Sequence, residues 1–206
     1  MANRKKPRKE KIPQVPIHGK AAHNTAFLTS IGGLIVNWAN NESVFLALLQ
    51  LFLIGGTHSA AIVWHSHRTT NARLELIGSL ARERVKDEQL LQDITNAIKR
   101  FKGFTGTRNF YCHATYRYDS DLCLASATAT TNAQVDEPLK FEVKRMDLAA
   151  LNEMKFASVE MGKFNRELWK LVLRLQTELG VQHVNLPPLL QEQKSDLDAP
   201  THQGKG

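Results

Sequence analysis

The sequence of 206 residues has few cysteines, few prolines and no long apolar run. Its two cysteines, Cys112 and Cys123, exclude a disulfide-rich scaffold and a zinc site made of four cysteines. Seven prolines and 12 glycines exclude a collagen-like or proline-rich chain. The most apolar stretch, residues 44–55, contains Gln50 and is too short for a membrane-spanning helix, which needs about 20 apolar residues. We therefore expect one globular domain, located in the cytoplasm, without a transmembrane segment.

The positive charge is concentrated at the N-terminus. The chain carries 27 Lys and Arg against 20 Asp and Glu, a net charge of +7, and most of that excess lies in residues 1–20. This segment also contains prolines and lacks a helical apolar period, so we predict a disordered basic arm over residues 1–24. Such an arm binds phosphate backbones or anionic surfaces, or serves only as a solubilising tail. The basic residues expected to contact nucleic acid are Arg4, Lys5, Lys6, Arg8 and Lys9.

Apolar residues recur at helical spacing along most of the remaining chain. The helices predicted from this period cover residues 26–56, 59–85, 87–102 and 108–116. Thr105 or Thr107 would cap the short fourth helix. A long last helix follows from Asp147, and Gly180 is expected to end it. Short connections between the early helices indicate antiparallel neighbours.

The period changes from helical to alternating between the fourth and the last helix. Residues 122–131 are rich in β-branched threonine, and residues 139–144 alternate between apolar and charged side chains. This pattern predicts a β-hairpin at about 121–145. The expected fold class is therefore mainly α, an antiparallel bundle of four to five helices over 25–186 with the hairpin inserted before the last long helix. Residues 187–206 are predicted to form a disordered tail.

One short stretch carries the residue types that RNA cleavage needs. Its sequence is Arg108-Asn109-Phe110-Tyr111-Cys112-His113. Histidine can take the proton of a 2′-hydroxyl or give one to the leaving 5′-oxygen near neutral pH. Arginine offers a fixed fork of donors to a phosphate that gains charge in the transition state. Arg108, Asn109 and His113 are therefore the candidate catalytic residues, and we expect no cofactor and no metal ion.

This stretch resembles the signature of the HEPN superfamily, the higher eukaryote and prokaryote nucleotide-binding helical domains. The signature is Arg, four to six residues and then His, with a polar residue, often Asn, directly after the Arg. The resemblance implies a helical bundle that forms a homodimer in which two copies of the motif face one cleft. Many members are metal-independent ribonucleases, including toxins and antiviral effectors, and others only bind RNA or nucleotides. It therefore implies RNA as a partner, and an antitoxin or another regulatory protein as a second one.

In this interpretation Arg108 stabilises charge on the phosphate, His113 is the general acid or base, and Asn109 orients one of them. The chain departs from the family pattern in two places. The hairpin is an insertion, and Thr115 stands where some members carry a tyrosine two residues after the His. Tyr116 follows one place later, and we assign it a supporting role.

Glu42 lies on the apolar stripe of the first long helix, where an unpaired carboxylate is costly to bury. It is assigned a supporting role on the hypothesis that it pairs with Arg108 and holds the guanidinium in place. The alternative is that Glu42 sits at the edge of the stripe and reaches solvent, or pairs with Arg68 or Arg73.

Two other functions stay open at this point. One is an RNA-binding module without turnover. The other is a non-catalytic helical interaction protein that dimerises or associates with anionic surfaces through its basic N-terminal arm. Cleavage of RNA in the absence of metal ions separates the ribonuclease from both.

Overall fold

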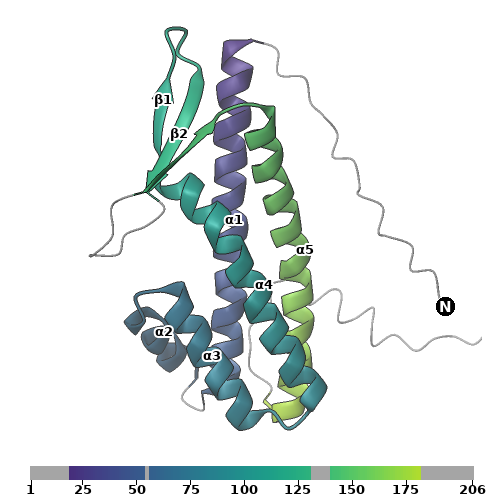
Figure 1. The fold of residues 1–206 in the computed structure, drawn as a ribbon. Helices are drawn as coiled ribbons and strands as arrows, with labels where there is room; N and C mark the ends of the chain where they lie inside the picture. The colour runs from purple at the N-terminus through teal and green to yellow at the C-terminus, as the bar shows by residue number, and fades with distance from the viewer. Residues whose placement is uncertain (1–18, 54–55, 131–139, 182–206) are drawn as a thin grey trace, which may run out of the picture.

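Five helices and a three-stranded sheet form the part of the chain that the structure describes. A computed structural model of the protein describes residues 19–53, 56–130 and 140–181. The elements are α1 (Lys20–Phe52), α2 (Gly56–Ser66), α3 (Thr70–Arg84), α4 (Glu88–His113), β1 (Thr115–Tyr118), β2 (Leu124–Thr130), β3 (Phe141–Arg145) and α5 (Leu148–Leu179), drawn in Figure 1. The predicted mainly-α bundle with strands before the last helix is confirmed.

The predicted arm and tail fall largely outside the described residues. All five basic residues expected to contact nucleic acid lie in residues 1–18, and the tail lies beyond residue 181. The boundary at residue 24 is wrong, because α1 begins at Lys20 and residues 20–24 are helical. The first turn of α1 is joined to the turn between β1 and β2, where the side chain of Asn24 donates to the carbonyl of Leu122 at 2.7 Å.

α1 and α5 lie side by side and run in the same direction (Figure 1). A polar seam fixes how they are aligned. The fully buried Asn41 donates to the carbonyl of Met161 at 3.1 Å, and Asn37 donates to Ser158 Oγ at 2.7 Å. The helices approach closely at Gly33, where an added Cβ would lie 3.4 Å from Ser158 Oγ. A buried amide needs its partners, so a shift of one residue between the helices would be costly.

An aromatic cluster forms the core where α1, α4 and α5 meet. Phe101 of α4 stacks on Trp38 of α1 with ring centroids 4.3 Å apart, and it also contacts Phe45 and Phe164 at 5.0 and 6.1 Å. Phe101 is fully buried and Trp38 is nearly so. Burying an aromatic side chain of this kind stabilises the fold by about 1.5–3 kcal/mol. The cluster therefore fixes the middle of α4 against α1, and with it the direction of the following turns.

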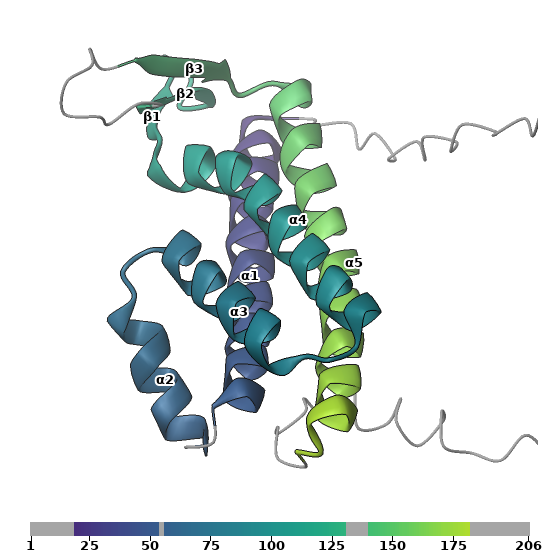
Figure 2. The ribbon, with the colours of Figure 1, turned by 60° about the horizontal axis from the view of Figure 1, so that its bottom comes forward.

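The helix predicted over 59–85 is two helices, α2 and α3, joined by a sharp turn (Figure 2). Thr69 is extended, and its side chain accepts a hydrogen bond from Ala72 N at 3.2 Å, which caps α3. Arg73 Nε donates to the carbonyls of Trp64 and His67 at 3.1 and 3.0 Å, and so satisfies groups at the end of α2. The apolar period continues through the turn, which is why the sequence suggested one helix.

The separate helix predicted over 108–116 is also wrong, because α4 continues without a break from Glu88 to His113. Thr105 and Thr107 lie inside α4 and cap nothing. Two glycines within the helix cost about 1 kcal/mol each relative to alanine. Burial of Phe101 before them and of Phe110 after them outweighs this cost.

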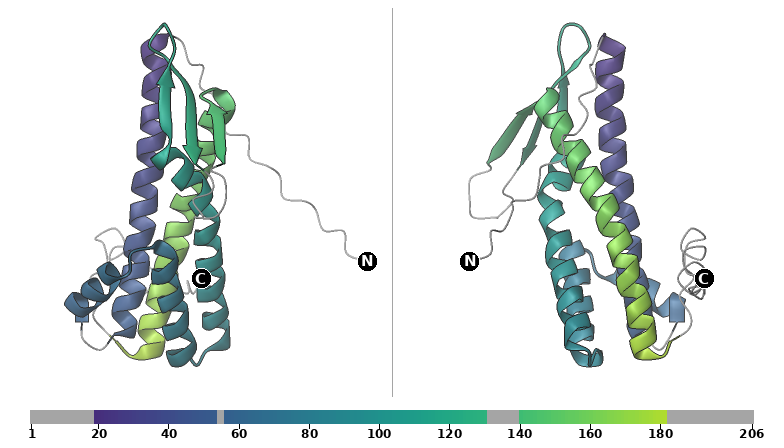
Figure 3. Two further views of the ribbon diagram at one scale, coloured as in Figure 1. Left: turned by 60° about the vertical axis from the view of Figure 1, so that its left-hand side comes forward. Right: turned by 90° about the vertical axis from the view of Figure 1, so that its right-hand side faces the viewer.

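The predicted hairpin is confirmed as β2 and β3, but the sheet has a third strand. β1 pairs with β2 and β2 pairs with β3, all antiparallel, so the order is β1-β2-β3. The first two residues of β1, Thr115 and Tyr116, were predicted to belong to the fourth helix. The sheet lies at the end of the bundle where α1 and α5 begin (Figure 3). As predicted, α5 begins directly after Asp147 and ends before Gly180, whose φ of 64° suits glycine. The side chain of Asp147 caps the helix.

Candidate functional site

The last turns of α4 bring the three predicted catalytic residues together. Arg108 Nη1 lies 2.9 Å from Asn109 Oδ1 and 3.5 Å from His113 Nε2. α4 then ends because Ala114 is extended, while its N–H still bonds the carbonyl of Phe110 at 3.0 Å. Asn109 and His113 are exposed, and Arg108 is half-buried. A charged guanidinium and an imidazole therefore lie next to each other at an exposed helix end.

The orientation of the Arg108–His113 contact assigns a role to each ring nitrogen. A guanidinium has donors only, so Nε2 of His113 acts as acceptor and the proton of the neutral ring is on Nδ1. At 3.5 Å the contact is long for a hydrogen bond, so it is readily replaced. A neutral imidazole whose Nε2 points at the guanidinium can accept a proton from a hydroxyl that enters between them.

The guanidinium of Arg108 rests on a residue that the sequence analysis did not select. It lies over the ring of Trp38, 5.2 Å from the centroid, in a cation–π contact. Trp38 in turn stacks on Phe101. Trp38 lies on the apolar stripe of α1, and nothing in that stripe distinguishes a residue that contacts Arg108 from one that only fills the core.

Arg108 has hydrogen-bonding capacity left over. No described residue bonds its Nε, which is buried, and no described residue bonds Nη2. Trp38 Nε1 is likewise buried without a partner among these residues. An unpaired buried donor costs about 1–3 kcal/mol. The buried Nε is out of reach of an incoming ligand, whereas Nη2 can donate to an acceptor such as a phosphate oxygen.

Cys112 lies between Tyr111 and His113 in sequence, and the charge of Arg108 affects the pKa of its thiol. The thiol is half-buried, and burial raises its pKa, while the positive charge of Arg108 acts in the opposite direction. The pKa of the thiol therefore depends on the charge of Arg108, although no hydrogen bond joins the two side chains. We assign it no catalytic role.

A second network fixes the end of α4 against β3 and α5. Lys144 Nζ lies 2.8 Å from Glu153 Oε1 and 4.6 Å from the ring centroid of Phe110. The hydroxyl of Tyr111, which is almost fully buried, donates to Glu153 Oε2 at 2.9 Å. Burial and then this hydrogen bond raise the pKa of Tyr111 well above its ordinary value. The network holds the helix turn that carries Arg108 and His113.

Tyr116 supports the same turn. Its hydroxyl donates to the backbone carbonyl of Tyr111 at 2.5 Å, so it bonds the end of α4 from β1. Burial raises the pKa of Tyr116 to about 12, with a smaller effect of Cys112. The hydroxyl therefore stays protonated and keeps donating through the physiological range. The structure does not bring its hydroxyl to Arg108 or His113.

The predicted pairing of Glu42 with Arg108 is wrong within the chain. Glu42 Oε1 accepts from Thr70 Oγ1 at 2.8 Å and lies 3.6 Å from Arg73 Nη1. The alternative pairing with Arg73 is the one observed. The reason is the turn at residues 67–69, which starts α3 beside α1 and places Arg73 next to Glu42. Glu42 therefore joins α1 to α3 and does not orient the candidate catalytic arginine.

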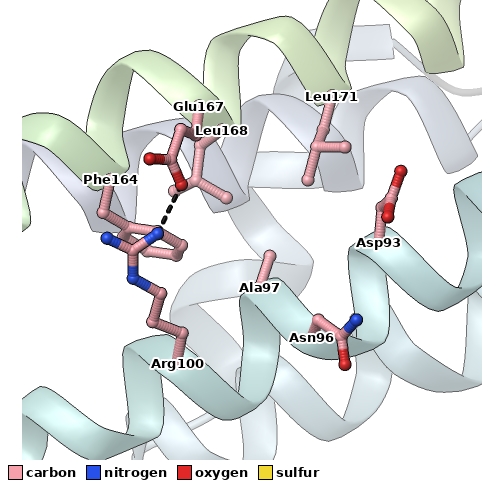
Figure 4. A pocket seen from close by; sticks show the side chains of 8 residues that line it. All are labelled: Asp93, Asn96, Ala97, Arg100, Phe164, Glu167, Leu168 and Leu171. Atoms are coloured by element: carbon pink, nitrogen blue, oxygen red, sulfur yellow. Dashed lines mark hydrogen bonds and ion pairs between the residues drawn. The ribbon is translucent and has the colours of Figure 1, made fainter. Parts of the chain in front are cut away.

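A surface pocket lies elsewhere, between α4 and α5 (Figure 4). It has a volume of about 270 Å³ and is lined by Asp93, Asn96, Ala97, Arg100, Phe164, Glu167, Leu168 and Leu171. Its charged groups are already paired: Arg100 binds Glu160 and Glu167, and Arg174 binds Asp93. Hydrogen bonds from Arg174 and then Gln89 lower the pKa of Asp93. These pairs favour a role in joining two helices over one in binding a ligand.

Comparison with known proteins gives no relative: no family model, no curated protein and no solved structure matches the chain. Within the described ranges, no helix has both the length and the apolar character needed to cross a bilayer. Among the same residues, no three or more His, Cys, Asp or Glu side chains are grouped in a way that could hold a metal ion.

Proposed function

We propose that the protein acts on RNA as a HEPN-like, metal-independent endoribonuclease with its site at the end of α4. The observation that carries the proposal is the contact between Arg108 Nη1 and His113 Nε2, 3.5 Å apart, with Asn109 on the same nitrogen of Arg108. The pair combines a proton acceptor with a fixed cation, and both are needed to cleave an RNA backbone.

The chemistry that these residues support is attack of a ribose 2′-hydroxyl on its own 3′-phosphate. His113 Nε2 takes the hydroxyl proton while the 2′-oxygen forms a bond to phosphorus. The bond from phosphorus to the 5′-oxygen breaks, and that oxygen is protonated as it leaves. Arg108 donates from Nη2 to a non-bridging oxygen, and its positive charge stabilises the negative charge that these oxygens gain in the transition state. The products are a 2′,3′-cyclic phosphate and a 5′-hydroxyl.

Asn109 has a positioning role in this proposal. Its Oδ1 accepts from Arg108 Nη1 at 2.9 Å and so holds one end of the guanidinium fork. The other terminal nitrogen, Nη2, then stays free to donate to phosphate. Trp38 supports the guanidinium through the cation–π contact.

The proposal includes a homodimer in which two copies of the motif face each other. One Arg108 and one His113 make a sparse site, and a two-fold axis would place a second pair beside the first. The partner pair would also supply a proton donor for the leaving oxygen. Light scattering at micromolar concentration should give twice the mass of one chain, and a strictly monomeric mass would contradict this part of the proposal.

A second candidate is a non-catalytic interaction protein, which exposed apolar side chains favour. Val36 on α1 and Phe156 and Val159 on α5 are 58%, 56% and 51% exposed. Such side chains suit a protein-protein contact. In that case RNA is left intact, and an antitoxin or another regulatory protein is not needed to hold an activity in check.

Cleavage of a mixed RNA pool in EDTA separates the two candidates. We expect the wild-type protein to cleave, His113→Ala to lose about 10²- to 10⁴-fold in rate and Arg108→Ala to lose about 10²- to 10³-fold. His65→Ala and Arg166→Ala are matched controls, since both residues are exposed and lie on α2 and α5. Cleavage that needs a metal ion, or that survives both substitutions in the motif, would reject the ribonuclease.

A further inference from the structure

The outward face of the three-stranded sheet carries exposed apolar side chains and two arginines whose side chains have no partner among the described residues. Strand pairing aligns Arg117 of β1 and Arg145 of β3 on either side of Ser126 of β2. The next row joins Thr115, Thr128 and Val143, and the row after it joins Thr130 to Phe141. Because side chains alternate between the two faces of a strand, these three rows share one face.

The opposite face of the sheet is the one that packs on the helices. Ala127 and Ala129 of β2 are buried, and the partners of Ala127, Tyr116 and Lys144, are half-buried. Lys144 contacts Phe110 of α4 and pairs with Glu153 of α5. The face with the two arginines is therefore directed away from the bundle.

The charge on the outward face has a single sign. Arg117 and Arg145 are exposed, and the side chain of neither forms a hydrogen bond or an ion pair with any residue that the structure describes. The three rows contain no carboxylate. Glu142 pairs with Ala129, and that row belongs to the opposite face of the sheet. The two arginines flank a serine, so they lie about 10 Å apart across two strand spacings. Two cations at this separation suit two phosphate groups of one chain.

The same face offers a platform for stacking. Phe141 is 62% exposed. Val143, two residues later and one row nearer the arginines, is also 62% exposed. An exposed phenylalanine on a sheet is costly in water and is typical of surfaces on which unpaired bases stack. The central strand presents the small hydroxyl side chains of Ser126 and Thr128, which leave room above the sheet and can bond a ribose or phosphate oxygen.

The sheet face is also continuous with the candidate catalytic residues. β1 begins at Thr115, and only Ala114 separates it from His113 at the end of α4. Thr115 is itself part of the outward face. The outward face therefore begins two residues after His113 in the chain.

We propose that this outward face binds a single strand of RNA, with phosphates on Arg117 and Arg145 and a base stacked on Phe141. The inference rests on the proposed function, because it makes the sheet the substrate-binding surface of the site at the end of α4. A surface of this size holds about two or three nucleotides. It accepts a single strand rather than a duplex, because the bases of a duplex are stacked on each other and do not reach the phenylalanine.

Binding is measured on the full chain with His113→Ala, which leaves the RNA intact during the experiment. The probe is a fluorescein-labelled single-stranded RNA of mixed sequence and about 12 nucleotides, followed by anisotropy at about 0.15 M salt. The variants are Arg117→Ala combined with Arg145→Ala, and Phe141→Ala alone. The matched control is Arg166→Ala combined with Lys170→Ala on the exposed surface of α5, which removes the same charge.

We expect Phe141→Ala to weaken binding about 5- to 100-fold, the effect of losing one stacked base. The double arginine variant should bind at least as weakly as Phe141→Ala. Its slope of log Kd against log salt should also fall by about 1.4, because two contacts to single-strand phosphates are lost. The control pair should retain the slope. Unchanged thermal unfolding of every variant shows that exposed side chains were removed without loss of the fold.

Crosslinking locates the strand directly. RNA that contains 4-thiouridine should crosslink to peptides from 115–118 or 141–145, and crosslinks only to other peptides would overturn the proposal. Equal affinities and equal salt slopes for the double arginine variant and its control would overturn it too. The same holds if duplex RNA binds as tightly as the single strand, or if the parent His113→Ala protein does not bind the single strand. Cleavage by the wild-type protein is measured in a separate experiment. A protein that binds RNA on the sheet but does not cleave it rejects the ribonuclease alone, and a protein that cleaves RNA without using the sheet rejects the sheet surface alone.

Discussion

The guanidinium of Arg108 lies 5.2 Å from the ring centroid of Trp38, and this contact joins the candidate catalytic helix end to the core of the bundle. Trp38 is 3% exposed and stacks on Phe101, so it has little freedom to move. Arginine side chains ordinarily lose considerable entropy when they are fixed. Here the core fixes Arg108 before any ligand binds, which favours the binding of phosphate.

The strength of this contact can be measured with a double-mutant cycle of Trp38→Leu and Arg108→Met. We expect a coupling free energy of about 0.5–2 kcal/mol, as for other cation–π pairs, from urea unfolding of the wild type, the two single variants and the double variant. Arg108→Met keeps the aliphatic stem and removes the charge. A coupling energy of zero within error would show that the ring does not hold the guanidinium.

Glu42 should affect stability and leave cleavage unchanged. Because its carboxylate bonds Thr70 and Arg73, Glu42→Gln is expected to lower the free energy of unfolding by about 1 kcal/mol or less. The rate of RNA cleavage by the folded variant should equal that of the wild type, since Glu42 does not reach Arg108 within the chain. A large loss of activity at unchanged stability would instead place Glu42 in the site, by contact across a dimer.

Lys144 should contribute more to stability than an ordinary surface lysine. Lys144→Met leaves Glu153 with Tyr111 as its remaining partner at a half-buried position, so the free energy of unfolding should fall by about 1–3 kcal/mol. Lys155→Met on α5 is the control, because Lys155 is also half-buried but has no ion-pair partner among the described residues. Equal effects of the two substitutions would contradict the role assigned to the network.

Cys112 provides a pH-dependent measure of the charge on Arg108. In a Cys123→Ser background, the rate of alkylation by iodoacetamide follows the fraction of Cys112 that is thiolate. Burial raises the pKa of Cys112 and Arg108 lowers it, so Arg108→Ala removes the lowering effect and should move the rate profile to higher pH. Arg166→Ala should leave the profile in place. A shift to lower pH, or none, would show that the guanidinium does not lie near the thiol.

The contacts among Arg108, Asn109 and His113 could be predicted from sequence because they are local. All three residues belong to one helix end, and the flexible arginine side chain closes the remaining distance. The helical character of α1, the bounds of α5 and the hairpin before α5 were likewise predicted, since each depends on a period of apolar residues or on a helix stop such as Gly180. These features need no knowledge of how one helix packs on another.

The features that the sequence did not predict depend on packing between elements. Trp38 contacts Arg108 only because Phe101 fixes the rotation of α4 against α1. Glu42 pairs with Arg73 because α3 starts at a turn that the continuous apolar period conceals. The continuity of α4 through its glycines follows from burial of Phe110, a tertiary effect that outweighs local helix propensity.

The chemical nature of the cleavage products tests the central claim most directly. An RNA oligonucleotide is incubated with the protein in EDTA, and the ends are identified by mass spectrometry beside a fully 2′-O-methylated copy. We expect 2′,3′-cyclic phosphate and 5′-hydroxyl ends from the unmodified RNA, no cleavage of the methylated copy and a large loss of rate with His113→Ala. Products with 5′-phosphate and 3′-hydroxyl ends, or cleavage of the methylated copy, would contradict attack by the 2′-hydroxyl and with it the role assigned to Arg108 and His113.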